Sequence, residues 1–333
     1  MYRSLRASLI VLLLAGFSYP AAWAQSCCSG GVPVSSNLGL PGGEKGVLQW
    51  SLAYDLNVLN TLQDGRRRLD DRSRNRSTHS VLAELGYTWS KRWSTDLFFS
   101  YIQQERTITQ GGRQTDFDRA SGLGDAVVLV KYRLLYRERG ATSFYLGWGA
   151  KLPRGGFDRV DERGILLSAD LQPGSGAWDG IFWGQLSQQL AFRPSMNVVA
   201  TTTIALKGEN PVFNTNETYA FGDEWLLALG LSDRIFVAKQ LFDPSLLLRY
   251  RTVRADFRND TELPSTGGQW LFLNPSLSWW LGKDVSVNAN FEIPIFADLE
   301  GTQATPSYRI NLGLYWRLAR KGKEPRLYLE EKK

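Results

Sequence analysis

Apolar and polar side chains alternate along about twelve segments of the chain, starting near Val47. In the last segment, residues 308–318, Leu312 and Trp316 share one face while Arg309 and Asn311 share the other. Because successive side chains of a β-strand point to opposite faces, this pattern predicts strands with one apolar and one polar face. Each segment has the ~9–11 residues that a tilted strand needs to cross a bilayer.

Aromatic residues fall near the ends of the apolar faces, as Tyr87 with Trp89 and Trp93 with Tyr101 do. The two interfacial girdles of a membrane barrel would place aromatic residues there. We expect the opposite face of nearly every strand to be polar along its whole length. The expected strands cover approximately residues 48–58, 78–90, 93–106, 126–137, 142–153, 178–192, 195–207, 221–236, 244–256, 268–282, 284–295 and 308–318.

The connections between these segments are sorted by length. Long polar links at about 60–77, 107–120, 154–177, 208–220, 257–267 and 297–306 alternate with tight links at 90–92, 137–141, 193–194, 239–243 and 282–283. Outer-membrane barrels alternate long outer loops with short periplasmic turns, which gives an even strand number. The sequence therefore predicts an all-β fold, a transmembrane antiparallel up-and-down β-barrel of about 12 strands, with 10 or 14 strands left open. A soluble all-β protein with a dry core is the alternative.

The start of the chain has the features of a secretory signal peptide. Arg3 and Arg6 precede an apolar run at 9–17, and Ala22-Trp23-Ala24 offers small residues for cleavage near Ala24. The run is too short for a membrane-spanning helix. We expect export to the outer membrane of a Gram-negative bacterium. The expected parts are a signal peptide at 1–24, a periplasmic or plug segment at 25–46, the barrel at 47–319 and a charged tail at 320–333.

Composition fits this architecture. The chain has 12 Trp, 13 Tyr, 16 Phe and 32 Gly but one His, and its mean hydropathy is −0.26. A transmembrane barrel is aromatic-rich without being apolar overall, since only alternate residues touch lipid. The formal charge of +6 falls to +4 when the two arginines Arg3 and Arg6 leave with the signal. This mild excess indicates no nucleic-acid partner.

Residues 121–137 read SGLGDAVVLVKYRLLYR, and a second Gly-Asp pair, Gly222 and Asp223, opens another expected strand. The chain resembles the family of outer-membrane barrel proteins named for the MetA pathway of phenol degradation, a group of transporters. The resemblance spans the barrel pattern over about residues 47–318 and implies uptake of aromatic compounds. The residues that match the family motif are Gly122, Gly124, Asp125, Lys131 and Tyr132.

Charged residues of both signs fall on the faces that we expect to line the lumen. They can line a small pore or close it with salt bridges, and the sequence leaves both open. A pore lined by mixed signs would have weak ion selectivity. The candidate lumen residues are Asp55, Glu84, Asp96, Lys131, Arg133, Lys151, Lys207, Glu224, Arg249, Arg251, Glu292 and Arg309.

The segment 25–46 contains Cys27 and Cys28, the two cysteines of the chain. A disulfide between neighbours is strained, and neither Cys-x-x-Cys spacing nor nearby histidines favour a metal site. Ala24-Gln25-Ser26-Cys27 loosely resembles a lipobox, so a lipid-anchored N-terminus stays open. We expect no metal and no cofactor.

The first long link is rich in arginine. On the outer surface it would meet lipopolysaccharide phosphates, which guanidinium groups bind well, or it is simply a solvated loop. The residues of the link are Arg66, Arg67, Arg68, Arg72, Arg74 and Arg76 with Asp64, Asp70 and Asp71.

The last strand is expected to engage the barrel-assembly machinery, although the tail that follows it departs from the usual pattern.

An enzyme of the outer-membrane phospholipase type would need His79, the single histidine, with Ser77. The order Ser-x-His is the reverse of that enzyme's His-x-Ser, and nothing near His79 identifies a further partner. We therefore expect no enzyme. The sequence favours a channel for small aromatic or hydrophobic solutes, and a closed structural or adhesive barrel with working outer loops is the alternative.

Overall fold

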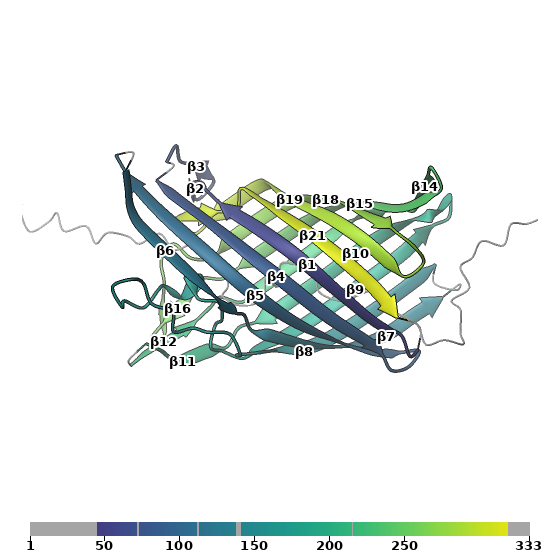
Figure 1. Ribbon diagram of the computed structural model, residues 1–333, viewed down its shortest axis with the longest axis horizontal. Helices are drawn as coiled ribbons and strands as arrows, with labels where there is room; N and C mark the ends of the chain where they lie inside the picture. The colour runs from purple at the N-terminus through teal and green to yellow at the C-terminus, as the bar shows by residue number, and fades with distance from the viewer. Residues whose placement is uncertain (1–44, 72, 112, 138–140, 215, 319–333) are drawn as a thin grey trace, which may run out of the picture.

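The computed structural model describes residues 45–71, 73–111, 113–137, 141–214 and 216–318 (Figure 1). Twelve strands form one closed antiparallel barrel, in which each strand pairs with its neighbours in chain order and the last pairs with the first, confirming the expected fold. The barrel strands are β1 (Leu48–Leu59), β4 (Arg74–Thr88), β5 (Trp93–Gln110), β7 (Ala126–Arg137), β8 (Thr142–Leu152), β9 (Asp179–Leu190), β10 (Arg193–Leu206), β13 (Glu224–Ser232), β15 (Gln240–Val253), β18 (Gly268–Trp280), β19 (Val285–Leu299) and β21 (Tyr308–Leu318).

Several expected loops have structure of their own. The expected link at 107–120 is largely a hairpin, because β5 continues to Gln110 and β6 pairs with it from Arg113 onward. The turn expected at 193–194 lies at 191–192, because β10 already begins at Arg193. The smaller elements are β2 (Thr61–Asp64), β3 (Arg67–Arg68), β6 (Arg113–Leu123), η2 (Ala169–Leu171), β11 (Glu209–Asn214), β12 (Glu217–Ala220), β14 (Ile235–Val237), β16 (Phe257–Arg258), β17 (Thr261–Glu262) and β20 (Thr302–Thr305).

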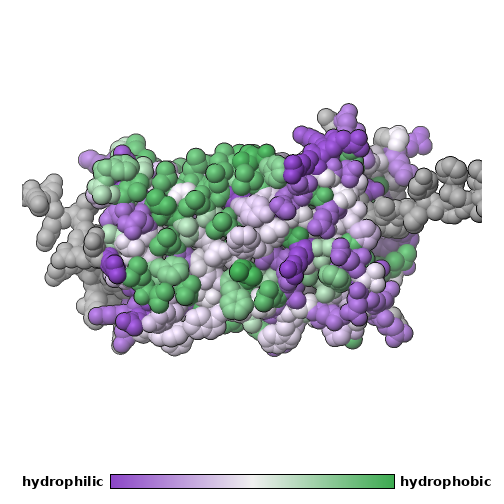
Figure 2. Space-filling view, turned by 180° about the vertical axis from the view of Figure 1, so that it is seen from behind, coloured by the Kyte–Doolittle hydropathy of each residue, from purple (hydrophilic) through white to green (hydrophobic). Residues whose placement is uncertain are grey.

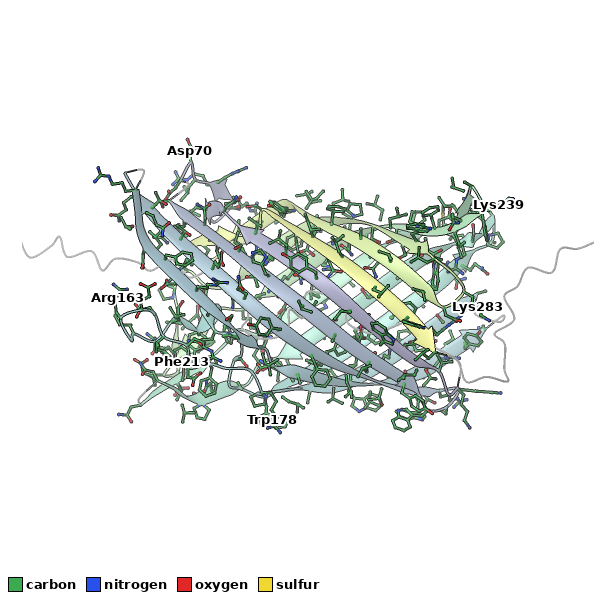
Figure 3. The ribbon with its side chains drawn as sticks, in the orientation of Figure 1. Asp70, Arg163, Trp178, Phe213, Lys239 and Lys283 are labelled. Carbon is green, nitrogen blue, oxygen red and sulfur yellow. The ribbon has the colours of Figure 1, made fainter. Side chains whose placement is uncertain are left out.

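The long links gather at one end of the barrel and the tight turns at the other. Asp70, Arg163 and Phe213 mark the first end, and Lys239 and Lys283 mark the second (Figure 3). No helix among the described residues is long and apolar enough to cross a membrane. The expected signal peptide at 1–24, Cys27, Cys28 and the expected tail from residue 320 lie outside the described residues.

The strands turn their apolar faces outward. On β21, Leu312 and Leu318 keep 49% and 46% of their surface exposed, while Arg309 on the opposite face keeps 6%. Figure 2 shows apolar atoms gathered over the middle of one side and hydrophilic atoms at the end that carries the long links. At the end with the tight turns, Trp93 packs against Tyr132 with ring centroids 4.7 Å apart. This arrangement is the one that a membrane barrel needs, with lipid outside and polar groups inside or at the rims.

The hydrogen-bonded ladder between β18 and β19 is interrupted at Pro275, which has no backbone N–H. Paired residues stop at Leu273 with Ile293 and resume at Ser276 with Asn290. Proline cannot donate to the ladder. The side-chain amide of Asn274 donates to the backbone oxygen of Phe291 across this gap, at 3.2 Å. The buried Asn274 amide therefore takes over a hydrogen bond that the wall would otherwise lack.

Replacing Asn274 with Leu should destabilise the barrel by about 1–3 kcal/mol, because a carbonyl in the membrane wall is left without a donor. The midpoint of guanidinium unfolding in detergent micelles measures this loss. Ser278→Ala, on the same face of β18, is the control. Equal midpoints for N274L and S278A would show that Asn274 does not repair the wall.

Candidate functional site

A belt of alternating charges begins at Asp125, directly before β7. Lys151 on β8 lies 3.4 Å from Asp125 and 2.8 Å from Asp179, the first residue of β9. Lys207, directly after β10, lies 3.4 Å from Asp179 and 4.0 Å from Glu224 on β13. All of these side chains are at most 2% exposed.

The belt continues along the inner wall from β13 to β1. Arg251 on β15 donates to Glu224 at 2.8 Å, and Arg249 on the same strand donates to Glu292 on β19 at 2.7 Å. Arg309 on β21 donates to Asp55 on β1 at 2.9 Å. We call these ten residues the charge belt: Asp125, Lys151, Asp179, Lys207, Glu224, Arg251, Arg249, Glu292, Arg309 and Asp55. Because each charge is next to an opposite one, the belt has no separated positive and negative sides.

The remaining candidate lumen residues lie outside the belt. Lys131 on β7 pairs with Asp96 on β5 at 2.5 Å, and Glu84 on β4 is buried. Arg133 is half-buried, with its guanidinium 4.7 Å from the ring of Tyr136. All twelve candidates were expected on inner faces, and Asp179 was not among them. Asp179 is the first residue of β9, and the alternation of apolar and polar side chains that marks the inner face becomes regular only after it.

The inner wall also carries apolar clusters, so the expectation of inner faces polar along their whole length is wrong. Val127 and Leu129 share the inner face of β7 with Lys131, and this face is apolar over the first half of the strand. Inside a narrow barrel, such side chains find contacts with one another across neighbouring strands. The first cluster contains Phe98, Val127, Leu129, Tyr145, Ile181, Trp183 and Ala205, and the second contains Val253, Trp270, Phe272 and Leu299.

Each cluster contains a tryptophan next to a cation. The ammonium of Lys131 lies 5.7 Å from the ring of Trp183, and the guanidinium of Arg251 lies 5.3 Å from the ring of Trp270. Cations over indole faces are attracted by the negative ring face. A Cβ on Gly147 would come within 3.2 Å of the Trp183 ring, so the glycine lets the indole lie close to β8. Aromatic surface and paired charge thus adjoin inside the barrel.

The link between β8 and β9 folds into the mouth of the barrel, and the expectation that it is a polar outer loop is wrong for residues 167–177. We call these residues the inward segment. Leu171 and Gln172 are fully buried. The backbone oxygen of Gln172 accepts from the Gln104 amide at 3.2 Å, and Asp170 accepts from Arg76 at 2.6 Å. One signal for this was present in the sequence, namely the uncharged small residues around Gly174 within an otherwise charged link.

The Gly-Asp motif forms the neck of the inward segment. Asp125 accepts from the backbone N–H of Gly155 and of Ser175, both at 2.9 Å, and is fully buried. A Cβ on Gly174 would lie 2.5 Å from the Cα of Gly155, so the two ends of the link cross where neither residue has a side chain. A Cβ on Gly124 would lie 2.2 Å from Ser100 Oγ. The motif therefore allows the close approach that turns the link inward.

The other motif residues have separate places. Gly122 faces Pro173 of the inward segment, since a Cβ there would lie 3.5 Å from the proline ring. Tyr132 is at the end with the tight turns, where its hydroxyl accepts from Arg92 at 3.0 Å. The second Gly-Asp pair repeats part of the pattern, because Asp223 accepts from the backbone N–H of Lys207 at 2.8 Å.

Two further loops close over the inward segment. Phe213, Tyr219 and Phe221 pack with Ala169 in one apolar cluster. The Tyr219 hydroxyl donates at 2.7 Å to Asp256, which lies beyond the end of β15. Burial raises the pKa of Asp256 to about 6 and raises the pKa of Tyr219 well above its usual value. We call Phe213, Tyr219, Phe221 and Asp256, with the loops that carry them, the cap.

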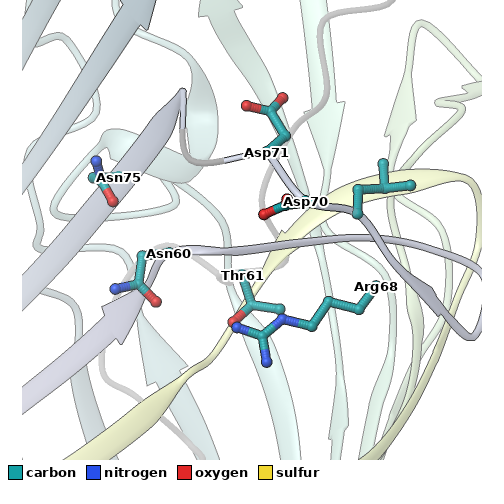
Figure 4. A pocket seen from close by; sticks show the side chains of 7 residues that line it. Asn60, Thr61, Arg68, Asp70, Asp71 and Asn75 are labelled. Atoms are coloured by element: carbon teal, nitrogen blue, oxygen red, sulfur yellow. The ribbon is translucent and has the colours of Figure 1, made fainter. Parts of the chain in front are cut away.

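The arginine-rich first link divides between the surface and the lumen. Arg76 is in β4 and points inward to Asp170, which corrects its expected place in a surface loop. Arg66 pairs with Asp298 at 2.7 Å, and Arg72 lies outside the described residues. A cavity of about 670 Å³ opens beside this link (Figure 4). Its lining is Asn60, Thr61, Arg68, Leu69, Asp70, Asp71 and Asn75.

His79 lies on the outer face, where its Nδ1 is 2.6 Å from the hydroxyl of Tyr54 on β1. Cross-strand pairing places Ser77 opposite Glu105 and His79 opposite Gln103. The imidazole thus has a tyrosine partner. Among the described residues, no group of three or more His, Cys, Asp or Glu side chains is arranged to hold a metal ion.

Comparison with solved structures finds proteins that are similar to this chain. The COG4313 outer membrane channel from Pseudomonas putida F1 is 11% identical, with a TM-score of 0.67, and the match covers 84% of this chain and 97% of that one. The transport unit of the autotransporter AIDA-I from Escherichia coli is 9% identical, covering 86% and 94%, with a TM-score of 0.49. No family model and no curated protein matches the chain. The first likeness shows that this chain has the fold of an outer-membrane β-barrel.

Lowering the pH from 7 to 5 should tighten the cap. The folded pKa of Asp256 is about 6, above its unfolded value of about 3.8, so the folded state binds the proton more strongly and stability is lost as pH rises between these values. The nearby charges of Asp170 and Lys207 act on the same carboxyl. Amide hydrogen exchange of residues 254–267 should therefore slow, relative to its intrinsic rate, at the lower pH.

The control is Asp256→Asn, which cannot titrate and should lose this component of the pH dependence. If wild type and D256N show the same change in protection between pH 7 and pH 5, Asp256 does not set the stability of the cap.

Proposed function

We propose that the protein is an outer-membrane channel of a Gram-negative bacterium that lets small aromatic or hydrophobic solutes cross. The observation that carries this proposal is the pair of inward-facing apolar clusters around Trp183 and Trp270, inside a closed barrel whose outer face is also apolar. A barrel that served only as a water-filled pore would have no need of aromatic side chains on its inner wall.

The chemistry of the inner wall suits an uncharged ring. An aromatic solute can pack against Trp183 or Trp270 in edge-to-face or offset geometry. The charge belt, with its signs paired at each step, offers such a solute polar contacts without a strong net field. The sequence resemblance to the family of the phenol-degradation pathway supports the same solute class. Because both indoles are almost completely buried, a solute reaches them only when neighbouring groups move.

Location and partners follow from the same proposal. The apolar outer band would contact membrane lipid, and residues 1–24 would be removed during export near Ala24. Exposed arginines at the end with the long links, such as Arg66, would face lipopolysaccharide phosphates. The final strand β21 would be read by the barrel-assembly machinery, with residues 320–333 as a periplasmic tail.

A closed barrel with a structural or adhesive role is the second candidate. The observation that favours it is the completeness of the pairing around the charge belt, together with the buried inward segment. Single-channel recording separates the two candidates. A pure closed barrel gives no reproducible current steps in a planar bilayer, whereas a channel does.

A small neutral aromatic such as benzyl alcohol should partially block the current of the reconstituted protein. Trp183→Ala should weaken this block about fivefold, because an aromatic contact contributes about 1 kcal/mol. Phe182→Ala is the matched control, since Phe182 is the adjacent residue of β9 on the outer face. Blocking constants from titrations of each variant make the comparison.

Two results would contradict the proposed solute class. One is the absence of block in the wild-type channel at any soluble concentration of the aromatic. The other is an equal change of the blocking constant in W183A and F182A, which would place the interaction at the lipid-facing surface.

A further inference from the structure

The inward segment crosses the mouth of the barrel. It leaves the wall beside β8, and its residue Asp170 meets Arg76 on β4, which β5 and β7 separate from β8 in the wall. Leu167 and Leu171 pack against Ala120 of β6 on the way. A connection of this kind usually runs over the surface because its backbone needs water. Here the wall supplies the hydrogen bonds instead.

The neck of the segment is built as a hinge. Gly155 and Gly174 touch without side chains, and Asp125 binds the backbone on both sides of the crossing. Lys151 donates to Ser175 Oγ at 2.5 Å, which ties the neck to the charge belt. Hinges are a few residues at the ends of elements that absorb changes of backbone angle. The glycine crossing supplies such residues at the base of the segment, while its far end is held separately.

The far end of the segment contains one buried ion pair. Arg76 donates to the side chain of Asp170 at 2.6 Å and also to its backbone oxygen, and Gln104 accepts from the same guanidinium. The side chains of Arg76 and Asp170 are 3% and 4% exposed. Removing one partner of a buried pair leaves an uncompensated charge, which is strongly unfavourable. The contact therefore resists separation in wild type and is sensitive to a single substitution.

We propose that residues 167–177 form a movable constriction that decides what enters the barrel, positioned by Asp125 and held closed by the Arg76–Asp170 pair. This inference rests on the proposed channel function. When the pair separates, the segment swings about its glycine neck and opens a path to the charge belt and to the tryptophan clusters below it. Asp125 is a positioning residue, since it is fully buried and binds the backbone of the segment's neck.

Single-channel recording in potassium chloride, without any aromatic solute, tests the constriction. Arg76→Gln should raise the fraction of time spent in the high-conductance level by about tenfold, equivalent to about 1.4 kcal/mol. The charge-swapped double variant R76D/D170R should return that fraction toward wild type, because the pair is restored in reverse. Arg119→Gln removes an exposed arginine that pairs with Glu105 and is the matched control.

Heat-modifiable migration in gel electrophoresis first establishes that each barrel is folded. If R76Q does not fold, Gln104→Ala replaces it, because this change weakens the same contact without leaving a buried charge. Unchanged gating in a folded R76Q or Q104A overturns the constriction, as does a change of equal size in R119Q. Altered gating without block by benzyl alcohol would leave the constriction standing and remove the aromatic solute class.

Discussion

Every backbone N–H and C=O inside a lipid layer must find a partner in the protein, since no water is available there. The pairing of β1 with β21, from Leu48 with Leu318 to Val58 with Tyr308, closes the ladder and removes the last free edge. The same constraint explains the Asn274 side chain, which bonds to Phe291 beside Pro275. Closure then forces alternate residues to face lipid or lumen, and that division creates the interior on which function depends.

The interior of the barrel combines buried, paired charges with apolar and aromatic side chains. Buried charges are tolerated because each lies beside an opposite charge, as Lys151 does between Asp125 and Asp179. Apolar side chains fill the spaces between strands, and Trp183 and Trp270 join the two surfaces through Lys131 and Arg251. The result is an inner wall without a strong net field that still offers aromatic contacts. Such a wall fits the uncharged solute that we propose better than it fits an ion.

The sequence predicted the strand number, the outward apolar faces and the sorted connections because alternation over long strands is a strong local signal. It placed Arg309 and Asp55 on inner faces for the same reason. It could not predict contacts made between distant segments, such as Asp170 with Arg76, because these depend on a loop returning into the barrel. The Gly-Asp motif was visible, but its work in the neck became apparent only from the crossing of Gly155 and Gly174.

The function proposed for this barrel requires that the apolar face of each strand meets lipid, and quenching by nitroxide lipids measures which face does so. A fluorophore is attached at Leu229 or at its neighbour Ala228 on β13, in a chain whose Cys27 and Cys28 are replaced by serine, and the protein is placed in bilayers with nitroxide on the acyl chains. The account predicts strong quenching at Leu229, which is 54% exposed, and weak quenching at Ala228, which is 6% exposed. Equal quenching at the two positions, or stronger quenching at Ala228, would contradict it.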